Sequence, residues 1–173
     1  MSDLLQIVSG KLQASTGRIA ERLKAQIQAQ KNENTAKGLL RSGATLKQIL
    51  RHSSEALDKT REAIAAEYQQ LLKDSLAFSA ASTPALIREA QKHLHEIRAQ
   101  GEAELRAATA MMGKDDLYER LQKDLGAAYD RALTDLSLFL DYEGSAQKNR
   151  FIKRASAAVG GWLSGFLPKG PQQ

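Results

Sequence analysis

The sequence contains no cysteine, few aromatic residues and few prolines, and each shortage excludes a class of structure. Without cysteine the chain has no disulfide, no thiolate nucleophile and no cysteine-ligated zinc. Aromatic residues make up 5% of the chain, and the three prolines are Pro84, Pro168 and Pro171. Alanine, leucine and the long charged and amide residues, which favour helices, dominate the proline-free residues 1–83. The composition therefore predicts an all-α protein with long helices.

A long hydrophobic run is also missing. The N-terminus, MSDLLQIVSGKLQ, lacks the basic start and the continuous apolar stretch of a secretory signal. No window reaches the roughly 20 apolar residues that a helix needs to cross a bilayer. We therefore expect a cytoplasmic protein that is at most peripheral, on the inner face of a membrane.

Charge is distributed unevenly, although the net charge is only +5. Residues 113–145 carry four basic and eight acidic side chains, whereas residues 146–173 carry five basic and no acidic ones. A folded nucleic-acid-binding domain more often has its basic residues along its core helices. The concentration of positive charge at the C-terminus instead indicates a contact surface there.

The spacing of apolar residues predicts four long helices and a shorter C-terminal one. The first three cover about 3–31, 44–81 and 84–112, and the fourth runs from Asp116 to the sequence DYEGSAQ. Gly101 lies in the apolar stripe of the third helix, where it either permits close helix approach or weakens the helix. The expected fold is an elongated, coiled-coil-like bundle. Its parts are an N-terminal helix and hinge over 1–43, a three-helix antiparallel bundle over 44–145, and a basic amphipathic helix with its tail over 146–173.

The second helix carries a large apolar residue at every seventh position. These residues are Leu50, Leu57, Ile64, Leu71 and Phe78. A strict seven-residue repeat is typical of a helix in a supercoiled seam. The complementary positions, such as Ser53 and Thr60, are small or polar, so a single chain buries little along this seam. We therefore expect these residues to form an oligomer seam and the chain to be a homo-oligomer.

The titratable residues form no catalytic or metal-binding pattern. His93 and His95 lie two positions apart, so a helix separates them by about 200° and they cannot share a metal. We expect the histidines, including His52, to be exposed or boundary residues with local partners. The glycines form neither a G-x-x-x-x-G-K-[ST] loop nor a G-x-G-x-x-G motif. We predict that the protein is not an enzyme and has no cofactor, metal site or small-molecule substrate.

A basic segment over 35–52 is the feature that favours nucleic acid. It places a turn between two short apolar runs, and its basic residues include Lys37, Arg41, Lys47 and Arg51. Helix-turn-helix units can have this pattern, but the helix that follows is about three times as long as a recognition helix. Nucleic-acid binding through this segment is therefore the third hypothesis.

The segment 148–170, KNRFIKRASAAVGGWLSGFLPKG, contains the only tryptophan and no acidic residue. At about 100° per residue, its apolar residues occupy half of a helical wheel, and most of its basic residues lie in the first turns. The 13 uncharged residues of 155–167 are too few for a membrane span. Three interpretations stay open: a final core helix, a helix in the membrane interface, and a helix that folds on a protein partner.

Two features of this segment favour an external contact. Adjacent Gly160 and Gly161 each cost about 1 kcal/mol in a helix interior, so the helix is marginal until it docks. Its positive charge is also unrelieved by any acid. We therefore predict a non-enzymatic helical scaffold or adaptor that associates with an anionic membrane surface or a membrane-bound partner. The residues expected to make this contact are Arg150, Phe151, Lys153, Arg154, Trp162, Leu163, Phe166 and Leu167.

The alternative prediction is a structural subunit of a larger assembly, such as a phage-like or secretion-machine component. Its termini, which carry most of the excess charge, would bind neighbouring subunits. No motif in the sequence marks a known family.

Overall fold

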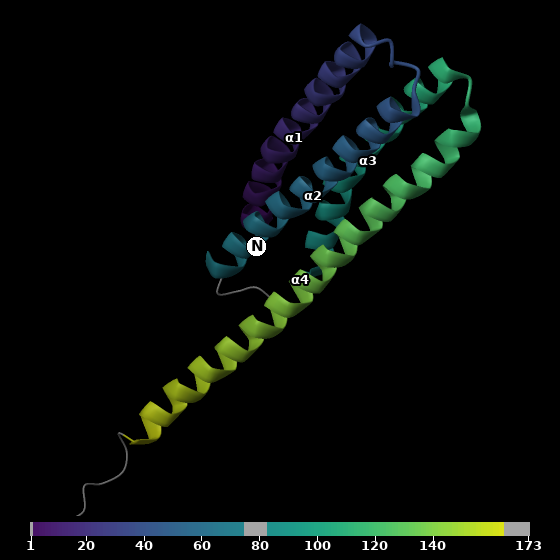
Figure 1. Ribbon diagram of the computed structural model, residues 1–173. Helices are drawn as coiled ribbons and strands as arrows, with labels where there is room; N and C mark the ends of the chain where they lie inside the picture. Colours follow the sequence, from purple (N-terminus) through teal and green to yellow (C-terminus); the bar gives the residue numbers. More distant parts are fainter. Residues whose placement is uncertain (1, 75–82, 165–173) are drawn as a thin grey trace, which may run out of the picture.

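Four α helices and no strand make up the residues that this computed structural model describes, 2–74 and 83–164. The helices are α1 (Ser2–Ala36), α2 (Gly43–Asp74), α3 (Thr83–Met112) and α4 (Asp115–Ser164). Side chains are described for residues 6–72, 83–114 and 116–146. Consecutive helices run in opposite directions (Figure 1), as their short connections predict. The all-α prediction is confirmed.

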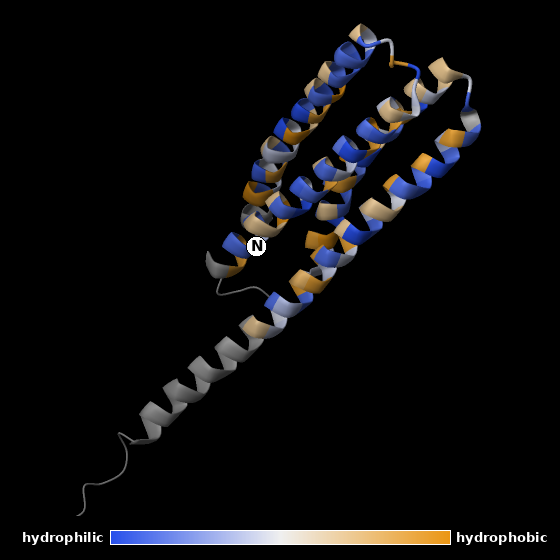
Figure 2. Cartoon of the chain, in the orientation of Figure 1, coloured by the Kyte–Doolittle hydropathy of each residue, from blue (hydrophilic) through white to orange (hydrophobic). Residues whose placement is uncertain are grey.

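Helices α2 and α3 form the centre of the bundle. They pack against each other; α1 packs on α2 and, over a smaller area, on α3, while α4 packs on both α3 and α2. Hydrophobic residues follow the inner sides of the helices, and hydrophilic residues follow the outer sides (Figure 2). Helix α3 is therefore covered by three neighbouring helices. The buried part of its circumference is wider than one stripe of apolar residues would produce.

One hydrophobic core contains residues from all four helices. The apolar stripes predicted for the third and fourth helices lie in it. Its fully buried members from these two helices include Ala90, Leu94, Ile97, Leu105, Leu125, Ala132, Leu136 and Leu140. The periodic pattern thus identified the buried sides of α3 and α4.

The seven-residue repeat of α2 is buried within the chain. Leu57, Ile64 and Leu71 are buried, Leu50 is partly buried against the core, and Phe78 lies outside the described residues. These leucines and Ile64 therefore make their contacts inside one chain. The homo-oligomer stays a prediction, and it requires a different surface.

Small hydroxyl residues occupy core positions of α2. Ser53 and Thr60 are fully buried, and each hydroxyl donates a 2.8 Å hydrogen bond to the carbonyl four residues earlier. That bond satisfies the buried hydroxyl without a partner from another helix. The small side chains then let neighbouring helices approach closely.

At Gly101, helices α2, α3 and α4 approach one another closely. A β-carbon at this position would lie 2.8 Å from both Cβ and Oγ of Ser53 and 3.1 Å from Cδ2 of Leu125. Of the two roles that the sequence allowed for Gly101, the structure supports close helix approach.

Helices α1 and α3 end in the same way, at a glycine in the left-handed conformation. Gly38 has φ 66° and Gly113 has φ 63°. Just beyond them, the Leu39 amide donates to the Asn34 carbonyl (2.7 Å), and the Lys114 amide donates to the Thr109 carbonyl (3.2 Å). These bonds close the last helical turn. The helix end predicted at Gly113 is confirmed, whereas the end predicted at Lys31 is wrong because α1 continues to Ala36.

Helix α4 is one continuous helix, and the separate C-terminal helix of the sequence prediction is not present. The predicted break near Gly144 is absent. A single glycine costs only about 1 kcal/mol in a helix, and the residues around it favour helix. At 1.5 Å per residue, the 50 residues of α4 extend about 75 Å, against about 45 Å for the 30 residues of α3. The C-terminal part of α4 consequently runs past the ends of the other helices (Figure 1).

Candidate functional site

The outer face of α4 carries exposed apolar residues. Leu138 is 63% exposed and Tyr142 is 72% exposed, and because they are four positions apart they lie on one side of the helix. Arg131 and Ser145 are exposed on the same side. We define the outer face of α4 by these four residues. It lies opposite the side of α4 that is buried in the core.

Acidic residues flank this outer face. Asp135 and Asp141 are both exposed, one on each flank. Asp135 is 57% exposed, and its Oδ2 lies 3.8 Å from Nε of Arg61 on α2. A long, exposed ion pair of this kind contributes little stability, so Asp135 can still bind a second cation.

The part of α4 beyond the bundle has its apolar positions on a different side from the core. At about 100° per residue, the buried positions 125, 128, 132, 136 and 140 and the apolar positions of 151–163 are centred about 130° apart. Leu138 lies about 20° beyond the edge of the second group, next to the direction of Leu163. The apolar side of the C-terminal part is therefore not a continuation of the core face.

The residues predicted to contact a membrane or partner fall in this C-terminal part. The structure places the backbone of Arg150, Phe151, Lys153, Arg154, Trp162 and Leu163 on α4, and their side chains are not among those described. Phe166 and Leu167 lie outside the described residues. No helix in the described part of the chain is long and apolar enough to cross a membrane.

The predicted nucleic-acid segment surrounds the connection between α1 and α2. Lys37 pairs with Glu33 at 2.5 Å and Arg51 with Glu55 at 3.6 Å, so two of its basic residues have an acidic partner on their own helix or next to it. Arg41 and Lys47 are exposed.

Buried Asn34 holds this connection in place. Its amide donates to Oγ1 of Thr45 at 2.9 Å and to Oε1 of Gln48 at 2.8 Å, both on α2. The Thr45 hydroxyl in turn donates to the Leu39 carbonyl at 2.9 Å. The polar residues of the segment thus join the end of α1 to the start of α2.

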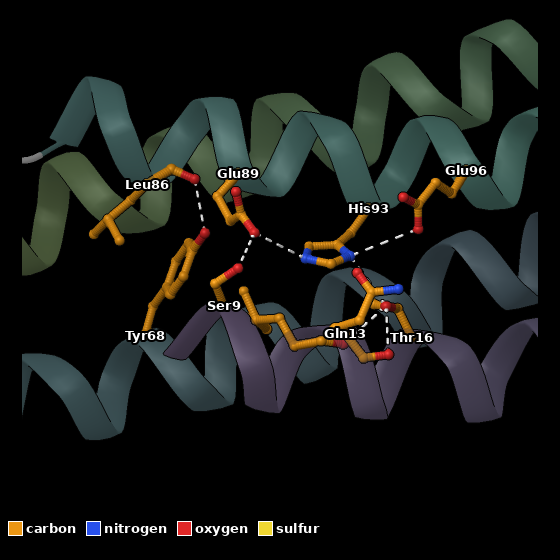
Figure 3. Close-up of polar contacts among 9 residues, drawn as sticks. Ser9, Gln13, Thr16, Tyr68, Leu86, Glu89, His93 and Glu96 are labelled. Atoms are coloured by element: carbon orange, nitrogen blue, oxygen red, sulfur yellow. Dashed lines mark hydrogen bonds and ion pairs between the residues drawn. The ribbon is translucent and has the colours of Figure 1, made fainter. Parts of the chain in front are cut away.

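A buried polar cluster joins α1 to α3 (Figure 3). Nδ1 of His93, which is fully buried, lies 3.1 Å from Oγ1 of Thr16 on α1, and its Nε2 lies 3.3 Å from Oε1 of Glu89. The Ser9 hydroxyl of α1 donates to the same Glu89 oxygen at 2.6 Å. Nearby, the hydroxyl of buried Tyr68 donates to the Leu86 carbonyl at 2.7 Å, which joins α2 to α3.

The order hydroxyl, imidazole, carboxylate in this cluster resembles a catalytic relay, but its geometry is structural. The Thr16 hydroxyl donates to the Leu12 carbonyl at 2.8 Å, and Thr16 is only 2% exposed. A nucleophile needs a free hydroxyl and room for substrate beside it. We therefore assign the cluster to the positioning of α1 on α3. Within the described residues no three His, Asp or Glu side chains gather as a metal site requires.

The sequence prediction for His93 is wrong. His95 is exposed, and Nδ1 of the largely buried His52 lies 3.6 Å from Glu55, so these two follow the expectation of exposed or boundary histidines with local partners. His93 is instead fully buried, because the arc of α3 that it occupies is covered by α1. One stripe of apolar residues could not reveal this second buried side of α3.

The carboxyl of Glu89 gives the cluster a dependence on pH. The hydrogen bond from Ser9 lowers the pKa of Glu89 below its usual value of 4.5; burial opposes this shift, and the charges of His93 and Lys92 add to it. Because the folded-state pKa is the lower one, ionised Glu89 stabilises the fold above pH 4.5, and this contribution is lost as the pH falls through the folded-state pKa.

We therefore expect the melting temperature to fall on acidification below pH 4.5, and to fall less steeply in Glu89→Gln and Ser9→Ala variants. Thermal unfolding followed by circular dichroism between pH 7 and the acid limit measures this. Glu62→Gln, at an exposed site on α2, is the control and should keep the wild-type slope. An unchanged slope in Glu89→Gln would exclude the stabilising role of this carboxylate.

Comparisons with known proteins assign no family to the chain. No protein-family model matches it, and no curated protein or solved structure gives a significant match. Function is therefore inferred from the residues and their geometry.

Proposed function

We propose that the protein is a non-enzymatic helical scaffold that attaches to an anionic membrane surface through the distal part of α4, residues 147–164, and the tail that follows. The observation that carries this proposal is the continuity of α4 beyond the bundle. The apolar residues of this segment lie on one side only if the segment is a helix, and α4 is helical through Ser164. The bundle would be elongated and coiled-coil-like, with residues 146–173 as its attachment unit.

The register of α4 favours an external contact over a final core helix. The apolar positions of 151–163 are centred about 130° from the positions that α4 buries in the core. A straight helix cannot turn both sides toward one bundle. The distal apolar side therefore requires another environment, and a membrane interface accommodates one apolar side of a helix.

The residue types match a membrane interface. Lys148, Arg150, Lys153 and Arg154 lie in the first turns of the distal part, and each basic residue near an anionic surface contributes about 1 kcal/mol. Phe151 lies among these basic residues and Trp162 and Phe166 follow them, and aromatic residues prefer the boundary between lipid head groups and chains. The connections between α1 and α2 and between α3 and α4 lie at the other end of the bundle, where they would be free for further partners (Figure 1).

Vesicle flotation tests the proposal. The full chain should float with phosphatidylcholine vesicles that contain phosphatidylserine, and much less with phosphatidylcholine alone. The triple reversal Arg150→Glu, Lys153→Glu and Arg154→Glu should abolish flotation. The matched control reverses Arg41, Lys47 and Arg51 at the other end of the bundle and should float like the wild type.

Other outcomes identify the alternatives. Equal flotation of the wild type and of the triple reversal at residues 150–154 contradicts the membrane proposal. A large defined assembly in lipid-free buffer, without flotation, favours a structural subunit. Salt-sensitive retention of DNA or RNA that is lost in the variant at residues 41–51 favours nucleic-acid binding.

A further inference from the structure

The outer face of α4 has the composition of a helix–helix contact. Leu138 and Tyr142 are its two exposed apolar residues, and within the described part of the chain no other helix covers them. Exposed acids flank them on both sides, Asp135 on one and Asp141 on the other. Further along the same helix the charge changes sign, with Lys148 and Lys153 and no acid after Glu143. Apart from Arg131, the charges that flank this face are thus acidic before residue 144, which we call the acidic half, and basic after it, which we call the basic half.

We propose that a second copy of this chain docks antiparallel along the outer face of α4, so that two copies form a two-fold symmetric dimer. An antiparallel pair sets the acidic half of each α4 against the basic half of the other. A parallel pair would set each acid beside itself. The proposal needs no lipid, although Lys148 and Lys153 are also two of the four basic residues assigned to the membrane surface; Arg150 and Arg154 take no part in the dimer pairs.

Two charge pairs fix the same register. We call the line along which the two α4 helices touch the contact line. In an antiparallel pair, a position on one copy faces a position on the other copy when the two lie at equal distances on either side of the two-fold axis and on the same flank of this line. Asp135 and Lys153 are 18 positions apart, which is five turns of α helix, so they share a flank, and their midpoint is residue 144. Asp141 and Lys148 are seven positions apart, about two turns, and share the other flank. Their midpoint lies between residues 144 and 145.

The same register is compatible with the remaining positions of the face. Ser145 lies at the axis, close to Tyr142 of the other copy, and Leu138 lies opposite the turn that contains Ile152. Arg131 lies opposite the uncharged positions 157–159, so it meets no like charge. Each of the two charge pairs occurs twice in the dimer. Four ion pairs would therefore surround a small apolar centre.

The dimer is also compatible with attachment to a membrane. A two-fold axis perpendicular to both helices keeps a given flank of each helix on one side of the dimer. Phe151 and Trp162 lie on the flank of Asp141, further from the contact line. Both copies would therefore present these aromatic positions to the same plane.

Charge reversal tests the pairing, with molar mass in lipid-free buffer measured by sedimentation or light scattering. The wild type should be a dimer. Asp135→Lys with Asp141→Lys, and separately Lys148→Glu with Lys153→Glu, should each be monomeric. An equimolar mixture of these two variants should recover a heterodimer, because every ion pair is then restored. The control, Glu21→Lys with Asp58→Lys at exposed sites on α1 and α2, should remain dimeric.

Cysteine cross-linking tests the direction. Because the chain lacks cysteine, Ser145→Cys should form an intermolecular disulfide efficiently under mild oxidation. Ala127→Cys is the matched control: it is exposed along the same line of α4, but an antiparallel pair separates its two copies by about 50 Å. Cross-linking of both variants overturns the antiparallel arrangement. A monomeric wild type, or a mixture of the reversed variants that stays monomeric, overturns the dimer, and flotation of that same monomer would leave the membrane proposal intact.

Discussion

Replacing Gly101 with valine is expected to lower the free energy of unfolding by about 3 kcal/mol, and replacing it with alanine by about 1 to 2 kcal/mol. In most helix interiors alanine stabilises relative to glycine by about 0.5 to 1 kcal/mol. At Gly101 the sign reverses, because a β-carbon there meets Cβ and Oγ of Ser53 at 2.8 Å and Leu125 at 3.1 Å. To relieve that overlap, α2 and α4 must move away from α3. Urea denaturation followed by circular dichroism measures the loss.

Two further variants isolate the steric cause. Gly17→Ala lies inside α1, where an added β-carbon meets no heavy atom within 4 Å, so this variant should gain about 0.5 to 1 kcal/mol. Ser53→Gly removes the two nearest of the three atoms that an added β-carbon meets, and combined with Gly101→Ala it should cost less than the sum of the two single changes. A Gly101→Ala chain as stable as the wild type would show that the three helices do not approach this closely.

The second large effect is expected for His93→Ala, at about 3 kcal/mol. The change leaves a cavity at a fully buried position and removes the partner of Thr16 and Glu89. Because the cluster joins α1 to α3, the loss should also be local. Hydrogen exchange should accelerate in α1 around Thr16 more than in the contact between α3 and α4.

His95→Ala is the matched control for this prediction. It removes the same side chain two residues further along α3, at an exposed position, and should change stability by less than about 0.5 kcal/mol. Similar losses for the two histidines would contradict the buried cluster. If His93→Ala lowers the free energy of unfolding without faster hydrogen exchange in α1, then His93 stabilises the core as a whole and does not specifically hold α1 on α3.

The sequence alone predicts the fold class and most of the buried sides. The periodic spacing on α3 and α4 identifies Ala90, Leu94, Leu125 and Leu136 as core residues, because one side of each helix is apolar. The glycine at 113 also identifies the end of α3, since only glycine adopts its backbone conformation easily. These features are local, and local spacing is enough to find them.

Features that depend on contacts between helices escape sequence analysis. The polar stretch before Ala36 has the composition of a loop, but Asn34 is buried and hydrogen-bonded to α2, which extends α1. His93 is missed because α3 is covered on three sides. The unbroken course of α4 past Gly144 is missed because glycine is a breaker only where other interactions also favour an end.

The exposed residues of the outer face could have been found from the sequence. Leu138 and Tyr142 lie outside the apolar stripe of α4, so a helical wheel already separates them from the core side. Only the structure shows that none of the other described helices covers them. The structure also adds information on the distal part of α4. Because α4 is one continuous helix, the direction of its distal apolar side can be compared with that of its core side, and the two differ.

The fluorescence of Trp162 tests membrane attachment most directly, because it is the only tryptophan in the chain and lies in the proposed contact. Its emission should shift to shorter wavelength when phosphatidylserine-containing vesicles are added, and quenchers attached to lipid chains should reduce it. Salt should weaken the shift, because the basic residues attract the anionic surface electrostatically. Emission that stays unchanged at saturating concentrations of these vesicles would contradict the proposed attachment.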